Sequence, residues 1–278
     1  MSPLGENKNV KSLSFDSMVN LYDETRTFDR DCFDSALDFL VERFPPCDYG
    51  NVLEPGIGTG RIAIPLTERG YRTTGIDISE EMLSILKYRL ARSKKPLQIS
   101  VQKADMTDLP FPDASFDMVV AVHLFWFIKQ WRKAVDEILR VVRSDGPVVL
   151  IHTGMGAEIP FLNNRYKELC AEQGYPIESV WVKSTTEVID YVIEQGYRVE
   201  QIRDRWRWTS HIRLDKALSY VKSRAYSFTT FAPDSVHEIV VGRLESELKE
   251  QFGSLTTVID VPNQIYLVFI MGRESCLS

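Results

Sequence analysis

The residues whose types and spacing point most clearly to a chemical function lie in one short segment, residues 52–61, which reads VLEPGIGTGR. Glu54 ends an apolar run, and Gly56, Gly58 and Gly60 alternate directly before a helical pattern begins. Glycine is needed where a tight turn takes a positive φ and where the backbone must approach a ligand without a Cβ in the way. In an open parallel sheet, the turn after the first strand faces the crevice where ligands bind. We therefore predict a ligand-binding turn here.

Two classes of ligand use such a turn. Read from Gly58, residues 58–63 satisfy the G-x-G-x-x-A pattern of dinucleotide-binding proteins, and Asp77 follows about 20 residues on, as that pattern requires. Glu54 favours a different ligand, because a carboxylate at the lip of the turn repels a pyrophosphate and attracts an ammonium group. The residues thus favour a cationic ligand and leave a dinucleotide as the alternative.

The sequence around the turn alternates between short β-branched runs and helical periods, which is typical of βαβ units and a parallel sheet. We predict Ser79 as the N-cap of the second helix after the turn. The fold class is therefore predicted as α/β, with a doubly wound, mostly parallel sheet and an N-terminal helical segment. The predicted strands cover 51–54, 73–77, 99–103, 116–123 and 147–152, and the predicted helices cover 31–44, 60–69, 79–91 and 129–142.

The pattern changes after residue 152. Helices are predicted over 160–173 and 184–195, strands over 197–208 and 264–271, and a helical, lid-like insertion over 209–262 before the last strand. We expect one domain over 1–278, because no repeat or Pro/Gly/Ser-rich linker divides the chain. Within it, 1–48 form an N-terminal helical cap, 49–155 the cofactor-binding core and 156–278 the substrate side.

The composition narrows the classes of partner. A net charge of −6 and a pI near 5.4 argue against extended binding to nucleic acid, which usually requires a basic surface. Cys32, Cys47, Cys170 and Cys276 show neither a disulfide framework nor a zinc-ligand spacing, so no metal is expected. The first residues lack an apolar signal segment and the apolar run at 118–128 is too short to span a bilayer, so we expect a cytoplasmic protein.

Four segments in this order resemble the motif set of the class I S-adenosylmethionine-dependent methyltransferases: LEPGIGTGR, GIDISEEML, ADMTDLPFPDASFDMVVAVH and AVDEILRVVRSDGPVVLIH. The subgroup that looks most similar contains the ubiquinone and menaquinone biosynthesis methyltransferases. The resemblance covers residues 51–152 and, more weakly, 184–205. It implies that S-adenosyl-L-methionine is the methyl donor and S-adenosyl-L-homocysteine the product. It also implies an in-line displacement by an N, O, S or C nucleophile of a small-molecule acceptor.

Two alternatives remain beside this resemblance. One is an NAD(P)-dependent oxidoreductase that uses residues 58–63, and the other is a non-catalytic cofactor-binding scaffold.

The resemblance implies roles for residues along the cofactor. Glu54 would hold the methionine amino group through water or the backbone, and the three glycines of the turn would pass under the cofactor. Asp77 would accept hydrogen bonds from both ribose hydroxyls, with Ile78 and Met82 packing near the adenine. Purely structural roles are the alternatives, because alternating glycines also make a tight turn and Asp77 also suits a strand-end cap.

Three further segments have implied roles. Asp105 would receive the adenine amino group and Met106 would lie beside the ring, although Asp105 also suits a simple turn aspartate. Tyr22 and Arg26 resemble the Y-D-x-x-R stretch that often precedes this domain and folds over the cofactor. An exposed polar helix end is the alternative for that stretch.

Two histidines are candidates for the catalytic step. His123 and His152 are predicted at the carboxyl ends of two strands, beside the expected methyl position, and His123 also near the cofactor. Histidine titrates near neutral pH, so either could act as a general base or as a substrate anchor. The alternative is a hydrogen-bonded pocket histidine with no proton-transfer role. His211 and His237 are expected at the surface of the insertion.

Overall fold

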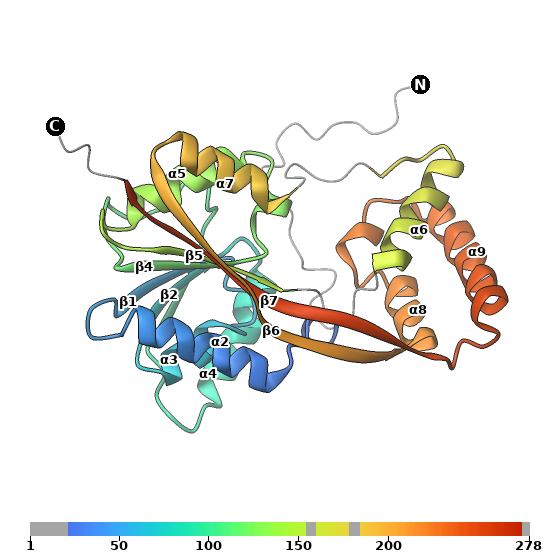
Figure 1. Cartoon of the computed structure of the whole chain (residues 1–278), viewed down its shortest axis with the longest axis horizontal. Helices are drawn as coiled ribbons and strands as arrows, with labels where there is room; N and C mark the ends of the chain where they lie inside the picture. The colour runs from blue at the N-terminus through green and yellow to red at the C-terminus, as the bar shows by residue number, and fades with distance from the viewer. Residues whose placement is uncertain (1–21, 154–159, 178–183, 274–278) are drawn as a thin grey trace.

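A seven-stranded sheet organises the part of the chain that the computed structural model describes, residues 22–153, 160–177 and 184–273 (Figure 1). β1 to β5 pair in parallel, whereas β7 runs antiparallel to both β5 and β6. The predicted fold class, a doubly wound and mostly parallel sheet, is confirmed. In sheet order the strands are β3 (Ile99–Lys103), β2 (Arg72–Asp77), β1 (Asn51–Pro55), β4 (Met118–Val122), β5 (Val148–Thr153), β7 (Val258–Arg273) and β6 (Tyr197–Arg213).

The strand order reverses at β1, whose neighbours β2 and β4 lead away toward opposite edges of the sheet. In such sheets, ligands bind in the crevice outside the carboxyl ends of the strands at this switch point. The glycine turn starts where β1 ends, so the sheet places the turn at this crevice.

Helices cover both faces of the sheet (Figure 1). Val52 of β1 packs on the face that carries α2 and α3, and Leu53 packs on the opposite face with α5 and α7. Because successive side chains of a strand point to opposite faces, both Val52 and Leu53 are fully buried. The bounds are α2 (Arg30–Arg43), α3 (Ala63–Glu68), α4 (Glu80–Ala91), α5 (Trp131–Val141) and α7 (Thr185–Glu194).

Two local expectations near the turn have different outcomes. α4 begins as predicted, with the Ser79 hydroxyl accepting a hydrogen bond from the Met82 N–H at 3.0 Å. The helix predicted over 60–69 is shorter and begins only at Ala63. The reason is that Gly60 has a positive φ of 83°, which keeps it in the turn and out of the helix.

A helical lobe stands beside the sheet and has its own apolar core (Figure 1). It is built from α6 (Pro160–Glu172), α8 (Leu214–Lys222), the short helix η3 (Ser227–Thr229) and α9 (Asp234–Phe252). α6 thus joins the predicted insertion, although it precedes α7 in the chain. The division of the chain into a single domain with three parts stays a prediction.

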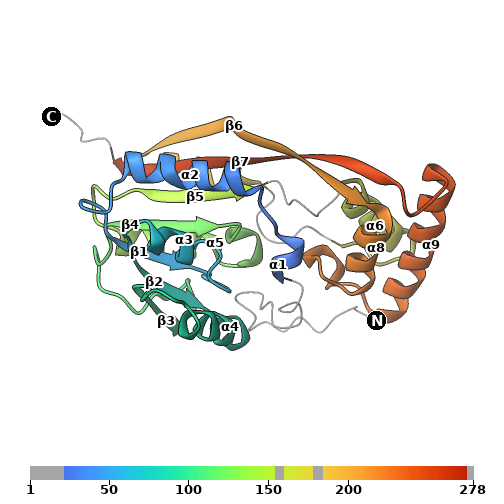
Figure 2. The same ribbon diagram turned by 90° about the horizontal axis from the view of Figure 1, so that it is seen from below.

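The last two strands connect the sheet to the lobe as a long antiparallel ribbon (Figures 1 and 2). Their pairing continues as far as Arg213 and Val258, so both strands are longer than predicted. The added residues pair their backbone groups with each other, a contact between distant segments that a local pattern does not show. A register shift between Ile202 and Trp206, with Asp204 at a φ of 64°, interrupts the ribbon.

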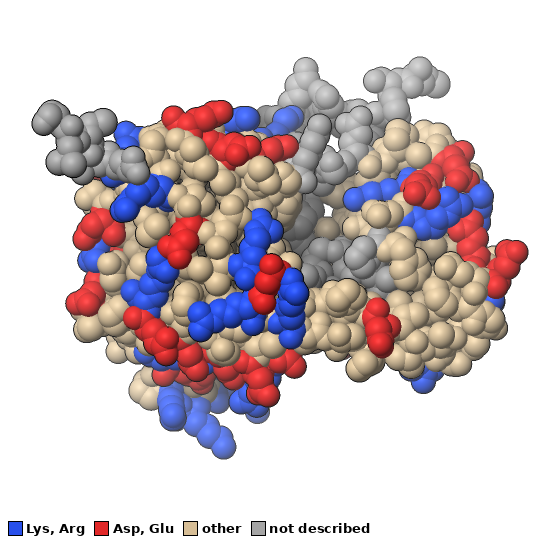
Figure 3. Space-filling view, in the orientation of Figure 1, with Lys and Arg blue, Asp and Glu red and all other residues tan. Residues whose placement is uncertain are grey.

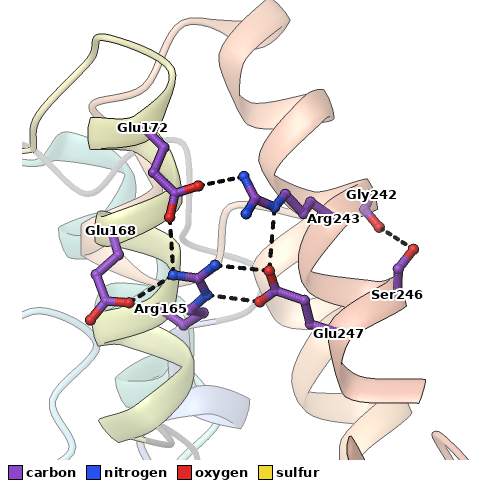
Figure 4. A network of polar contacts seen from close by, with 7 residues as sticks. All are labelled: Arg165, Glu168, Glu172, Gly242, Arg243, Ser246 and Glu247. Atoms are coloured by element: carbon purple, nitrogen blue, oxygen red, sulfur yellow. Dashed lines mark hydrogen bonds and ion pairs between the residues drawn. The ribbon is translucent and has the colours of Figure 1, made fainter. Parts of the chain in front are cut away.

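Charged side chains link α6 to α9 (Figure 4). The Arg165 guanidinium donates to both carboxylate oxygens of Glu247, at 2.7 and 2.8 Å, and also to Glu168 and Glu172 at 2.9 and 3.2 Å. Arg243 pairs with Glu172 and Glu247. Single exposed ion pairs stabilise a protein by about 0–1 kcal/mol, so the apolar core of the lobe must carry most of its stability.

The lobe overturns one expectation about histidine. His237 was expected at the surface and is buried, with its Nδ1 at 2.7 Å from the Tyr166 hydroxyl. The expectation was wrong because α6 packs against this face of α9 and supplies the tyrosine. His211 is exposed on β6, as expected, with Nδ1 at 2.7 Å from Asp260.

The described surface carries both signs of charge. Figure 3 shows Lys and Arg interspersed with Asp and Glu over the sheet part and the lobe. Cys32, Cys47 and Cys170 are free thiols. Among the described residues, no helix combines the length and the apolar character needed to cross a membrane.

Candidate functional site

The glycine turn has the backbone that its sequence predicts. Gly56, Gly58 and Gly60 have φ values of 69°, 54° and 83°, all in the left-handed region that side chains disfavour. A Cβ on Gly56 would lie 2.5 Å from a methyl carbon of Leu124, so this glycine permits close packing. Within the described ranges, the atom nearest to a Cβ on Gly58 would be the Gly56 carbonyl oxygen, at 3.9 Å. Gly58 therefore presents open backbone, as a ligand-binding turn requires.

Asp77 braces this turn from the end of β2. Its Oδ2 accepts a hydrogen bond from the Gly58 N–H at 2.9 Å, and its Oδ1 accepts one from the Ser79 N–H at 2.9 Å. A carboxylate oxygen has two lone pairs, so this bracing is compatible with further hydrogen bonds to a ligand. The predicted role of Asp77 toward a ribose stays a prediction, and the structure adds that Asp77 holds the turn.

Glu54 is a buried carboxylate beside the turn. It is 3% exposed, and its Oε2 has no hydrogen-bond partner among the described residues. Burial raises the pKa of the Glu54 carboxyl well above its usual range, against the opposing effect of the Arg61 charge, while Asp77 adds to the increase. An unpartnered buried oxygen is costly, so this position is suited to a ligand that donates hydrogen bonds or carries a positive charge.

The side chains predicted around the adenine lie near the ends of β2 and β3. Met82 and Met106 are buried, and Ile78 is half-buried. Asp105 accepts a hydrogen bond from the Thr107 N–H at 2.8 Å through its Oδ1. This is the turn geometry of the alternative role, and the predicted contact of Asp105 with a ligand stays a prediction.

The N-terminal stretch reaches the glycine turn through α1 (Tyr22–Thr25). The Arg26 carbonyl accepts a hydrogen bond from Arg61, directly after the turn, and Arg61 lies over the Phe28 ring at 4.4 Å. The side chain of Tyr22 lies outside the described part of the structure, so its predicted role is untested.

The two candidate histidines lie together at the carboxyl ends of β4 and β5. Their ring centroids are 5.8 Å apart and their planes are nearly perpendicular. His152 also stacks on Tyr266 of β7, with centroids 4.6 Å apart and planes 12° apart. The Thr185 hydroxyl lies 3.5 Å from His152 Nδ1 and 3.2 Å from the Tyr266 hydroxyl. His123 has a positive φ of 48°, a strained conformation for a residue other than glycine.

Both imidazoles are neutral at pH 7. Burial, together with the charges of Arg26 and Arg61, lowers the pKa of His123 to about 4. Burial, together with His123 and Arg203, lowers the pKa of His152 to about 3. A general base works best with a pKa near the operating pH. These low pKa values therefore favour a role in hydrogen bonding to a substrate over removal of a proton from it. His152 Nε2 is buried and has no partner among the described residues.

Comparison with known proteins places this geometry in a family. Residues 53–150 match the family described as "Methyltransferase domain". Over these residues the chain is similar to methyltransferase domains. The match begins at Leu53 and so includes Glu54, the glycine turn, Asp77 and Asp105. The resemblance predicted from the four motifs is confirmed.

Relatives of this methyltransferase domain carry methyltransferase names. One is "Phosphatidylethanolamine N-methyltransferase" from Cereibacter sphaeroides, 36% identical over 103 residues that cover 37% of this chain and 50% of the relative. Another is "Demethylmenaquinone methyltransferase" from Clavibacter sepedonicus, 32% identical over 140 residues that cover 50% of this chain and 56% of the relative. The chain thus spans about half the length of these curated relatives.

The fold has solved relatives. The YcgJ protein from Bacillus subtilis is 20% identical, with a TM-score of 0.59 over 87% of this chain and 99% of that one. At this identity the likeness concerns the fold alone.

The methyltransferase domain match ends at residue 150, and several residues of the site lie beyond it or before it. Thr185 and Tyr266 beside His152 were not predicted. Neither was Asp23, which contacts the glycine turn from α1. Tyr266 could have been suspected from the pairing of the last strand with β5, whereas Thr185 and Asp23 carry no local signal that sets them apart.

Proposed function

We propose that this protein transfers the methyl group of S-adenosyl-L-methionine to a small-molecule acceptor. The observation that carries the proposal is the buried Glu54 carboxyl group beside the glycine turn. Among the residues that the structure describes, its Oε2 has no partner and the backbone at Gly58 is open. A positively charged amino group suits this carboxylate, whereas a pyrophosphate would be repelled by it. The comparisons name methyltransferases and give no support to the nicotinamide alternative.

The residues of the turn would hold the methyl donor, which supplies a methyl group on a positively charged sulfur. Glu54 would bind its amino group, and the backbone at Gly58 would lie against it. Asp77 would bind the ribose hydroxyls while it keeps the turn in place, with Ile78, Met82 and Met106 around the adenine. We also expect contacts with the methyl donor from Tyr22, Arg26, Asp105 and His123.

The acceptor would lie beside His123 and His152. Their neutral imidazoles would orient the nucleophile by hydrogen bonds, and the Tyr266 and Trp126 rings near His152 would help to exclude water. Positioning supplies most of the acceleration when the leaving group is already activated, because a well-oriented pair of reactants reacts with an effective molarity on the order of 10⁵ M or more. The acceptor atom would be N, O, S or C.

Calorimetric titration tests the methyl-donor site. We expect the wild-type protein to bind S-adenosyl-L-homocysteine with a Kd in the micromolar range and not to bind NADH. Glu54→Gln should weaken binding about tenfold or more, because a charged hydrogen bond to the amino group is lost. Glu81→Gln, an exposed glutamate on α4, is the matched control and should bind as the wild type does. Binding of NADH instead of S-adenosyl-L-homocysteine would refute the proposal.

A second measurement separates an enzyme from a cofactor-binding scaffold. Incubation with methyl-labelled S-adenosyl-L-methionine and a fractionated pool of cell metabolites should transfer label to a small molecule. Binding without any transfer would favour the scaffold.

We also propose a cytoplasmic location and a small-molecule partner rather than a nucleic acid. The free thiols of Cys32, Cys47 and Cys170 suit a reducing compartment, and the net charge of −6 disfavours a nucleic-acid partner. Fractionation of cells that express the protein tests the location.

A further inference from the structure

The short helix α1 lies between the glycine turn and the helical lobe (Figure 2). Consecutive side chains of α1 contact these two parts of the molecule. Asp23 contacts the turn and α4, whereas Glu24 contacts α8 in the lobe.

On the turn side, Asp23 completes a closed set of polar contacts. Its Oδ1 accepts a hydrogen bond from the Thr59 hydroxyl at 2.8 Å, and its Oδ2 pairs with Arg89 of α4. Arg89 in turn donates to the Thr59 carbonyl at 3.1 Å. Thr59 lies between Gly58 and Gly60 and is buried. Asp23 and Arg89 therefore hold both the side chain and the backbone of the turn.

On the lobe side, the contact is made by a tyrosine. The Tyr220 hydroxyl of α8 donates to Glu24 at 3.2 Å, and Tyr220 is 7% exposed. Because Asp23 and Glu24 are adjacent, a displacement of the lobe that pulls on Glu24 also acts on the contact that orients Thr59.

We infer that Asp23 is a positioning residue for the methyl-donor turn, and that α1 couples the turn to the helical lobe. The inference rests on the proposed function. A turn that must present its backbone to a ligand binds it more tightly when its conformation is ordered beforehand, because less conformational entropy is lost on binding. Asp23 provides this order although it is not one of the side chains proposed above to contact the ligand.

The first test is the affinity for S-adenosyl-L-homocysteine. Asp23→Asn removes the charge that pairs with Arg89 and should raise the Kd about tenfold, whereas Asp31→Asn removes an exposed carboxylate of α2 and should leave the Kd unchanged. In a double-mutant cycle, the effects of Asp23→Asn and Arg89→Gln on the Kd should be less than additive, because both substitutions remove the ion pair between Asp23 and Arg89.

The outcomes separate the two proposals. If the wild type fails to bind S-adenosyl-L-homocysteine, the proposed function fails. If the wild type binds and Asp23→Asn binds equally well, or lowers the Tm without raising the Kd, Asp23 is merely structural and the inference is overturned. Additive effects of Asp23→Asn and Arg89→Gln on the Kd would overturn it as well.

The second test concerns the coupling to the lobe. Tyr220→Phe should raise the Kd for S-adenosyl-L-homocysteine about fivefold, at the lower end of coupling between separate sites. Tyr191→Phe is the matched control. The Tyr191 hydroxyl also donates to a carboxylate, that of Asp136 on α5, at 2.8 Å. Equal Kd values for these two variants would overturn the coupling and leave the role of Asp23 standing.

Discussion

At the scale of single residues, the carboxylates around the glycine turn have different environments. Asp77 accepts backbone hydrogen bonds from both Gly58 and Ser79, which fix it to the turn and to the start of α4. Glu54 is buried, and one of its oxygens has no partner in the described part of the chain; burial disfavours its charged form until a positive charge is near. Asp77 therefore organises the turn in the free protein, whereas Glu54 is completed by a ligand.

Asp77→Ala should affect both stability and binding. We expect the binding free energy for S-adenosyl-L-homocysteine to become less favourable by about 1–3 kcal/mol, because hydrogen bonds to a charged group are lost. The Tm should also fall, because the Gly58 N–H loses its acceptor. Calorimetric titration and thermal unfolding measure the two effects, with the exposed Asp108→Ala as control. An unchanged Kd would count against the role proposed for Asp77.

His123 and His152 make the free energy of unfolding depend on pH. An unfolded histidine has a pKa of about 6.5, whereas the folded values are about 4 for His123 and about 3 for His152. The unfolded state therefore binds more protons, so stability is present at neutral pH and is lost as the pH falls below about 6.5 toward the folded values. At pH 5 we expect a loss of about 2 kcal/mol per histidine relative to pH 7.

Urea unfolding between pH 5 and 8 measures this loss. His152→Gln should lose less stability over this range than the wild type, and the exposed His211→Gln should behave as the wild type does. A pH dependence that is the same in all three proteins would show that His152 is not responsible.

At the scale of elements, the helices that flank the turn depend on local caps. Ser79 ends the loop after β2, and its hydroxyl accepts the Met82 N–H at the first turn of α4. The same helix carries Arg89, which contacts Thr59 in the glycine turn. A loose start of α4 would therefore affect the helix that supports the turn.

Ser79→Ala should lower the free energy of unfolding by about 1 kcal/mol, because the Met82 N–H loses its cap. Chemical unfolding measures this change. Ser84→Ala, at an exposed position within α4, is the matched control and should be neutral or slightly stabilising, because alanine favours the helix. Equal effects of the two substitutions would contradict the capping role.

At the scale of the whole molecule, the helical lobe is assembled from segments on both sides of α7 in the chain. Leu169 of α6 packs in one apolar cluster with Leu218 of α8 and Leu244 of α9. The charged contacts of Arg165 and Arg243 lie on the outside of the same pair of helices (Figure 4). α6 is therefore needed for the lobe to have a closed core.

Leu169→Ala should destabilise the whole lobe by about 2–5 kcal/mol, because it leaves a cavity in this core. Hydrogen exchange is expected to increase in α8 and α9, far along the chain from the substitution, and to remain low in α5. Ile193→Ala, at an exposed position on α7, is the control and should leave exchange unchanged. Exchange that increases only within α6 would show that α6 is not part of the lobe core.

Local patterns were enough to predict the sheet, its parallel strands, the glycine turn and the placement of His123 and His152 at the carboxyl ends of two strands. These features follow from local patterns, since hydrophobic period, glycine spacing and Ser79 at a cap act over a few residues, and the ends of neighbouring parallel strands meet at one edge. The carboxyl ends of β4 and β5 thus brought together two histidines that are far apart in the chain.

The pairing of distant segments follows from how the elements pack in three dimensions. The long β6–β7 ribbon, the place of α6 in the lobe and the burial of His237 all depend on contacts between distant segments. Asp23 and Arg89 are 66 residues apart, and Glu24 and Tyr220 are 196 apart. Such contacts leave no period in the sequence, because each depends on how whole elements pack rather than on the residues beside it.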